Sequence, residues 1–130
     1  MNYFDKDNNL ICIHISDVYD QKDTSFFTPE YVTLQAGCLN FSSSESVTNH
    51  IHNKRSSYVE DTVEILFILN GKLEITLFEI DKTKLERFSA KTGDLIILIS
   101  GGHGIKFIED TKILEVKQGP FLGLNDKQRF

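Results

Sequence analysis

The chain of 130 residues has little of several residue types. It contains no Trp, one Met, two Pro and two Cys. The two cysteines, Cys12 and Cys38, form no CxxC pair, and each lies in an apolar, strand-like segment. We therefore expect them to be buried free thiols rather than a disulfide or a pair of metal ligands.

Long runs of one residue class are also absent. No Lys/Arg run exceeds Lys54-Arg55 and the formal net charge is −5, which argues against a nucleic-acid-binding protein. No apolar stretch approaches the roughly 18 residues that span a bilayer. The first ten residues, MNYFDKDNNL, have neither the basic nor the apolar region of a secretory signal. These absences predict a cytoplasmic protein with no nucleic-acid or membrane partner.

The remaining composition is that of an ordinary globular protein. Hydrophobic residues make up 40% of the chain and charged residues 25%, and there are ten Phe. Such a composition is unlike that of a disordered chain. A chain of this length can bury enough surface for one core without disulfides. We expect residues 1–130 to form a single domain.

Short runs of β-branched and aromatic residues recur, separated by polar turns. This pattern indicates an all-β sandwich or barrel. The predicted strands are residues 10–16, 31–34, 47–52, 64–69, 72–80, 85–88, 94–99, 105–108 and 113–117. Asn70-Gly71 separates two of these runs and predicts a hairpin with a type I′ turn, which needs positive φ at both positions.

Three of the four histidines can meet one carboxylate. His50 and His52 are two residues apart on a predicted strand, so their side chains project from the same face. A polar loop then returns the chain to Glu64, and His103 follows the Gly101-Gly102 turn. Imidazoles and a carboxylate on a rigid sheet are suitable ligands for a first-row divalent ion, and positions remain open for water or substrate.

These residues resemble the two sequence motifs of the cupin superfamily. His50-Ile51-His52 is similar to the HxH of the first motif, and residues 64–71 (EILFILNG) are similar to its second half, in which a ligating Glu precedes a hairpin Gly. Residues 93–103 (GDLIILISGGH) resemble the second motif, which ends in the last ligating His. The resemblance implies a double-stranded β-helix, or jelly-roll barrel. It also implies one divalent metal ion, such as Zn, Fe, Mn or Ni, held by His50, His52, Glu64 and His103.

The chain departs from the family pattern in several places. Eleven residues separate His52 from Glu64 instead of the usual few, and His103 arrives one residue early. The remaining departures are Ser44, Ile99 and Phe107, which replace the family's Gly, Pro and Asn. An elongated hairpin would accommodate the longer spacing, whereas an altered turn would displace His103.

Other polar residues lie near the expected mouth of the barrel. Tyr58 and Lys117 are candidate catalytic bases, and Arg55, Glu115 and Gln118 are candidates for binding substrate. The alternative for Arg55 and Tyr58 is a mobile solvated loop. The alternative for Glu115 and Lys117, which share one strand face, is an exposed ion pair.

Two function classes remain open. The first is a metal-dependent enzyme acting on a small polar molecule. A loose similarity of residues 113–120 to small cupins encoded among surface-polysaccharide genes implies a sugar or sugar nucleotide, with isomerase-, epimerase- or oxygenase-like chemistry. The second is a non-catalytic ligand-binding cupin with a degenerate or vacant metal site, which the motif departures favour. The resemblance also implies a homodimer, and His14, outside the constellation, is expected to be structural or on the surface.

Overall fold

The computed structural model describes the backbone of residues 1–130 and all side chains except those of Leu124 and Asn125. Over these residues the secondary structure is β-strand with two short 3₁₀ helices, so the all-β prediction is confirmed. The strands are β1 (Asn2–Phe4), β2 (Leu10–Ile15), β3 (Ser25–Phe26), β4 (Gly37–Cys38), β5 (Glu64–Asn70), β6 (Lys72–Phe78), β7 (Lys84–Lys91), β8 (Leu95–Leu98), β9 (Gly102–Phe107) and β10 (Lys112–Lys117). The 3₁₀ helices are η1 (Val18–Asp20) and η2 (Gly123–Asp126).

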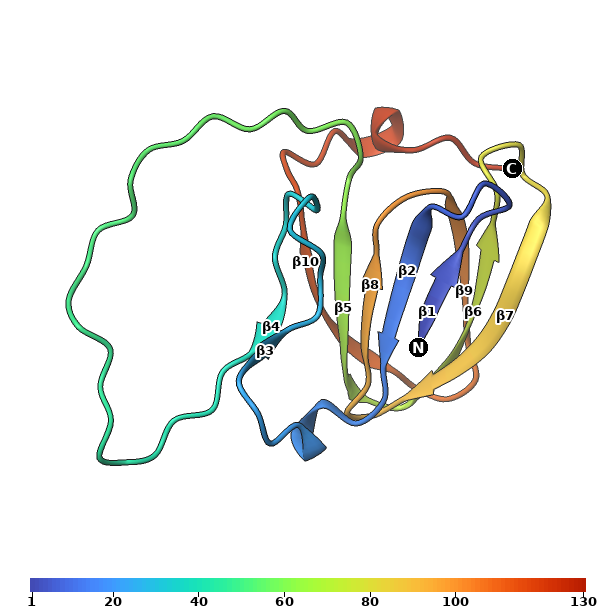
Figure 1. Cartoon of the computed structure of the whole chain (residues 1–130). Coiled ribbons are helices and arrows are strands. Elements are labelled where there is room, and N and C mark those ends of the chain that lie inside the picture. Colours follow the sequence, from blue (N-terminus) through green and yellow to red (C-terminus); the bar gives the residue numbers. More distant parts are fainter.

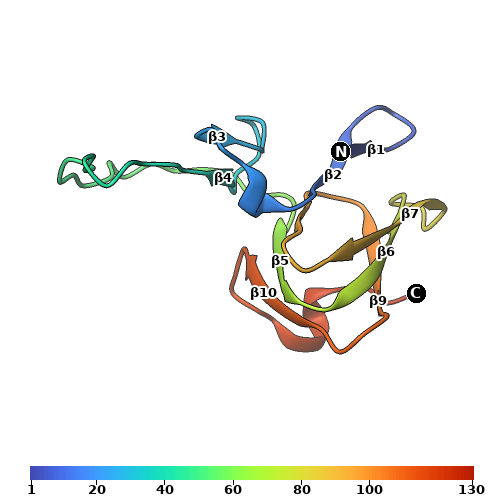
Figure 2. The same ribbon diagram turned by 90° about the horizontal axis from the view of Figure 1, so that it is seen from below.

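Two antiparallel sheets form the body of the molecule (Figure 1). The larger sheet has five strands in the order β1-β2-β8-β5-β10, and the smaller has three in the order β7-β6-β9. Seen from below, β5, β6, β9 and β10 surround a common interior (Figure 2). Strands β3 and β4 pair separately as a small two-stranded ribbon. From β5 onward the chain therefore passes repeatedly from one sheet to the other.

The core fills the space between the two sheets. Strand β6 contributes Leu73, Ile75 and Leu77, and β5 contributes Leu66 and Ile68, all of them buried. The spacing of two between these residues is the alternation expected of a strand with one buried face. The side chains that lie at the ends of these same faces, beyond the apolar core, form the candidate site.

A second apolar cluster covers the outer face of the large sheet. Ile13 of β2 and Ile97 of β8 pack there against Val32, Ala36 and Val63. Both faces of β2 and β8 are thus covered, and this explains why their sequences are almost continuously apolar. The predicted strand at residues 31–34 is wrong, because these residues form a turn over this cluster.

The connection between β5 and β6 is a crossing between sheets, so the predicted hairpin at Asn70-Gly71 is wrong. Strand β5 pairs with β8 and β10, whereas β6 pairs with β7 and β9. Of the two turn residues, Gly71 has positive φ (98°) and Asn70 does not, so the turn is not type I′. A Cβ at Gly71 would lie 2.5 Å from the backbone oxygen of Asp110, so glycine also permits a close approach of two turns.

Residues 39–62 form an exposed loop, which we call the arm. Figures 1 and 2 both show it projecting away from the sheets on the side of β3 and β4. Every residue of the arm is exposed, and across the described part of the chain no backbone-to-backbone hydrogen bond involves residues 46–62. The predicted strand at residues 47–52 is therefore wrong for this single chain, because a strand needs a hydrogen-bonded neighbour and the arm has none.

The two cysteines are free thiols, as predicted. Cys12 is buried in the core, and burial raises its pKa to about 12, so it stays protonated at neutral pH. Cys38 is half-buried in β4. In the described residues there is no helix of the length and hydropathy needed to cross a membrane.

Candidate functional site

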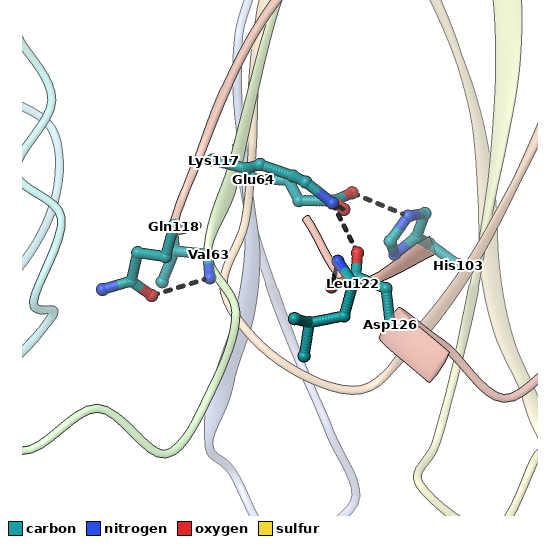
Figure 3. Close-up of polar contacts among 7 residues, drawn as sticks. All are labelled: Val63, Glu64, His103, Lys117, Gln118, Leu122 and Asp126. Carbon is teal, nitrogen blue, oxygen red and sulfur yellow. Dashed lines mark hydrogen bonds and ion pairs between the residues drawn. The ribbon is translucent and has the colours of Figure 1, made fainter. Parts of the chain in front are cut away.

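A carboxylate from the large sheet meets an imidazole from the small sheet. Glu64 begins β5, His103 is the second residue of β9, and Glu64 Oε2 lies 3.1 Å from His103 Nε2 (Figure 3). His103 is paired in register with Leu77 of β6. Directly opposite residues of antiparallel strands share a face, so His103 points into the interior beside the buried Leu77. The two sheets thus bring together residues 39 positions apart.

Lys117 and Asp126 extend this contact. Lys117, the last residue of β10, is paired in register with Glu64, and its Nζ lies 3.9 Å from Glu64 Oε1. The same Nζ lies 2.6 Å from Asp126 Oδ2 in η2 (Figure 3). We call these four residues, Glu64, His103, Lys117 and Asp126, the mouth cluster. Its charged groups alternate in sign, so each carboxylate contacts a hydrogen-bond donor or a cation.

The contacts shift the pKa values in a consistent direction. A hydrogen bond with His103 lowers the pKa of Glu64 below its ordinary 4.5, although burial of the carboxyl opposes the shift. The hydrogen bond to Asp126 raises the pKa of Lys117, and the same bond lowers the pKa of Asp126. Lys117 therefore carries its proton at neutral pH. In this arrangement it offers a positive charge to its neighbours.

A cleft opens beside the mouth cluster. Its volume is about 920 Å³, and Glu64, His103 and Asp126 are among its lining residues. The lining also includes Lys127 and Arg129 from the C-terminal tail. The cleft is large enough for a small polar molecule and offers it both acidic and basic partners.

Asp126, in the C-terminal tail, was not among the candidate residues predicted from the sequence. The tail returns to the body because Phe130 packs edge-on against Phe78, with ring centroids 5.1 Å apart. Phe121 lies under the Lys117 ammonium, 4.8 Å from Nζ to the ring centroid. The two aromatic residues in an otherwise polar tail were the available sequence signal for this docking.

The other two expected metal ligands lie elsewhere in the chain. His50 and His52 are exposed in the arm, where their ring centroids lie 5.0 Å apart. Within the described residues of one chain, no group of three or more His, Cys, Asp or Glu side chains is placed to hold a metal ion. The four expected ligands are thus divided into two pairs, Glu64 with His103 and His50 with His52.

The Glu64–His103 contact is a hydrogen bond whose length is also compatible with two ligands of one metal ion. Ligand bonds of about 2.1 Å place two ligand atoms roughly 3.0 Å apart at a right angle and roughly 3.4 Å apart at the tetrahedral angle. The observed separation of 3.1 Å lies between these values. The donor types also fit a first-row divalent ion. The neighbouring Lys117 opposes a cation there, so two further ligands would be needed for tight binding.

The remaining candidate residues are not part of the mouth cluster. Arg55 and Tyr58 lie in the arm; Tyr58 is 82% exposed and lines a different cleft of about 690 Å³. Glu115 is exposed on β10. Gln118 serves a structural role, since its Oε1 accepts a hydrogen bond from the Val63 backbone N–H at 3.2 Å and its Nε2 donates to Thr33. Lys117 pairs with Asp126 rather than Glu115.

Comparison with known proteins adds no identification. No family model, curated protein or solved structure matches the chain.

Proposed function

We propose that the chain is a cupin-type metal-binding protein whose cleft takes a small polar molecule, such as a sugar or sugar nucleotide. The contact that carries the proposal is the one between Glu64 and His103, 3.1 Å apart. These are the residues at which the two cupin-like motifs, 64–71 and 93–103, carry their ligating Glu and last His. The passage of β5 to β10 back and forth between two sheets supports a double-stranded β-helix.

The proposed ion has four protein ligands. Glu64 and His103 supply an oxygen and a nitrogen from the body, and His50 and His52 supply two nitrogens from the arm. A bound divalent ion would polarise a carbonyl or hydroxyl of the small molecule as a Lewis acid. The role of Lys127 and Arg129, which line the cleft, is to attract and orient an anionic or polyhydroxylated ligand there.

One observation favours a second candidate, a non-catalytic binding module without metal. The Lys117 ammonium already lies 3.9 Å from Glu64 and compensates its negative charge, which is the electrostatic role that an ion would take. In this alternative the cleft binds its ligand through Lys127 and Arg129, which are among its lining residues.

Elemental analysis of protein purified without a His tag separates the two candidates. The metal-binding proposal predicts close to one equivalent of divalent metal in the wild type and its loss in Glu64→Gln, which keeps the side-chain shape but removes the charge. Glu86→Gln, at an exposed position of β7, is the matched control and should keep the metal. A wild-type protein that takes up no Zn²⁺, Mn²⁺, Ni²⁺ or Fe²⁺ at neutral pH would overturn the proposal in favour of the metal-free module.

A further inference from the structure

The small sheet ends in an uncovered edge at β9. In the described strands β9 pairs with β6 on one side and is the outermost strand on the other. Phe107 of β9 is paired in register with Leu73 of β6, so both side chains face the interior. Leu73 is completely buried, whereas Phe107 is 59% exposed. The interior face of the sheet therefore lacks a neighbour beyond β9, and the edge offers unpaired backbone donors and acceptors.

The arm contains a segment suited to that edge. Residues 47–52 (VTNHIH) have the alternation of a strand and match the six-residue length of β9. In the single chain this segment is unpaired, and Ile51 is 94% exposed. A strand added to β9 would satisfy the backbone groups of both segments, as in β-strand addition between proteins.

The arm can meet either the β9 edge of its own chain or that of a neighbouring molecule, and its direction favours the neighbour. The arm leaves the body beside β3 and β4 and projects away from the sheet that contains β9 (Figures 1 and 2). Its 24 residues, 39–62, run out and return, so its tip reaches about 40 Å from its base at roughly 3.3 Å per residue. That reach is comparable with the diameter of a domain of this size, so a neighbouring molecule lies within range.

We infer that residues 47–52 of one chain add as a strand to the β9 edge of a second copy, and that the exchange is reciprocal. Each metal site then contains Glu64 and His103 from one chain and His50 and His52 from the other. The spacing of two places both arm imidazoles on one face of the added strand, where they can join His103. The inference rests on the proposed function for the metal, but the strand exchange itself can be tested without it.

A heterodimer of two defective chains tests the shared site directly. One chain carries His50→Ala and His52→Ala, the other carries Glu64→Gln and His103→Asn, and each bears a different histidine-free tag so that the mixed dimer can be isolated after co-expression. Reciprocal exchange predicts one intact and one empty site per heterodimer, hence about half the wild-type metal per chain, while each variant alone binds none. A heterodimer without metal, when the wild type binds it, would show that the ligands come from one chain and would overturn the inference.

Proline substitutions test the exchange separately from the metal. Ile51→Pro removes a backbone donor within the pairing segment, whereas Ser56→Pro makes the same change elsewhere in the exposed arm. In light scattering we expect a mass of twice the 14.9 kDa chain for the wild type and for Ser56→Pro, and of one chain for Ile51→Pro. A wild type of one-chain mass, or an Ile51→Pro variant that stays dimeric, contradicts the exchange. A dimer that responds as expected but binds no metal would leave the exchange standing and the metal proposal wrong.

Discussion

The imidazole of His14 lies 3.0 Å from the carboxylate of Asp94, a residue 80 positions later in the chain. Asp94 is 3% exposed and also accepts hydrogen bonds from the backbone N–H groups of Asp17 and Lys91, each at 3.0 Å. The His14 ring stacks on Phe88, with centroids 5.0 Å apart. This contact links β2, β7 and the start of β8. His14 is thus a structural histidine, one of the two alternatives expected from sequence.

Replacing Asp94 should destabilise the fold strongly. Asp94→Ala removes the acceptor of three hydrogen bonds at a buried position, and we expect the free energy of unfolding to fall by about 3 kcal/mol. Urea denaturation followed by circular dichroism measures the change. Asp23→Ala, at an exposed position, is the control and should alter the free energy of unfolding by less than about 0.5 kcal/mol. Equal stability of the two variants would mean that the His14–Asp94 contact contributes little.

Acid should weaken the fold in part through two buried carboxyl groups, those of Glu64 and Asp94. The pKa of Glu64 is lowered mainly by its hydrogen bond with His103; for Asp94, burial acts in the opposite direction but is outweighed by hydrogen bonds from Asp17, Lys91 and His14. A carboxyl group whose pKa is lower in the folded than in the unfolded chain stabilises the fold. This stabilisation is fully present above the unfolded-state pKa, which is 4.5 for Glu64 and 3.8 for Asp94, and it is lost as the pH falls through the lower folded-state pKa.

Urea midpoints measured between neutral pH and pH 3 test this prediction. The midpoint should decrease below about pH 5, where unfolded carboxyls begin to take up protons that the folded ones do not. In Glu64→Gln the decrease should be smaller, because one of the contributing carboxyl groups is gone. Glu86→Gln is again the control and should follow the wild type. A decrease of the same size in Glu64→Gln and in the wild type would contradict the assigned role of Glu64.

Removing the charge of Lys117 should favour metal binding. The ammonium lies 3.9 Å from Glu64 and repels a cation bound to that carboxylate. We expect Lys117→Gln to bind Zn²⁺ or Co²⁺ about fivefold more tightly than the wild type, the effect of one unit charge at about 4 Å in a well-solvated setting. Titration calorimetry measures the affinity. Lys106→Gln, exposed on β9, serves as the matched control and should leave it unchanged. Weaker metal binding by Lys117→Gln would contradict this prediction, and would show that the ammonium helps to hold Glu64 in the position for binding.

The arm should be the first segment that trypsin cuts. Lys54 and Arg55 are exposed, and the backbone around them makes no hydrogen bond to other described backbone groups. We expect cleavage there about tenfold faster than elsewhere in the chain, with the two fragments held together by the sheet. Mass spectrometry of early time points identifies the cut. The double variant Lys54→Gln/Arg55→Gln should lose the early cut and keep the wild-type stability. First cleavage within β5 to β10 would show that the body, and not the arm, opens most readily.

Local patterns in the sequence predicted much of the fold. Short runs of apolar and β-branched residues between polar turns marked β2, β5, β6 and β8, since such runs are typical of strands with at least one buried face. The sequence assigns Gly71 and Gly101 to turns, and both have positive φ. The same kind of reasoning paired β5 with β6 wrongly. A turn sequence shows that the chain reverses, but the partner of a strand depends on contacts made by distant residues.

For the site, the sequence by itself determined which side chains can carry the chemistry: one carboxylate and three imidazoles, in a fixed order along the chain. Only the tertiary structure decided which of them meet. It joined Glu64 to His103 across two sheets, added Asp126 from a tail that folds back, and left His50 and His52 on the exposed arm. The physical reason is that periodicity fixes the direction of a side chain within its own strand, whereas proximity between strands depends on how sheets and loops pack as a whole.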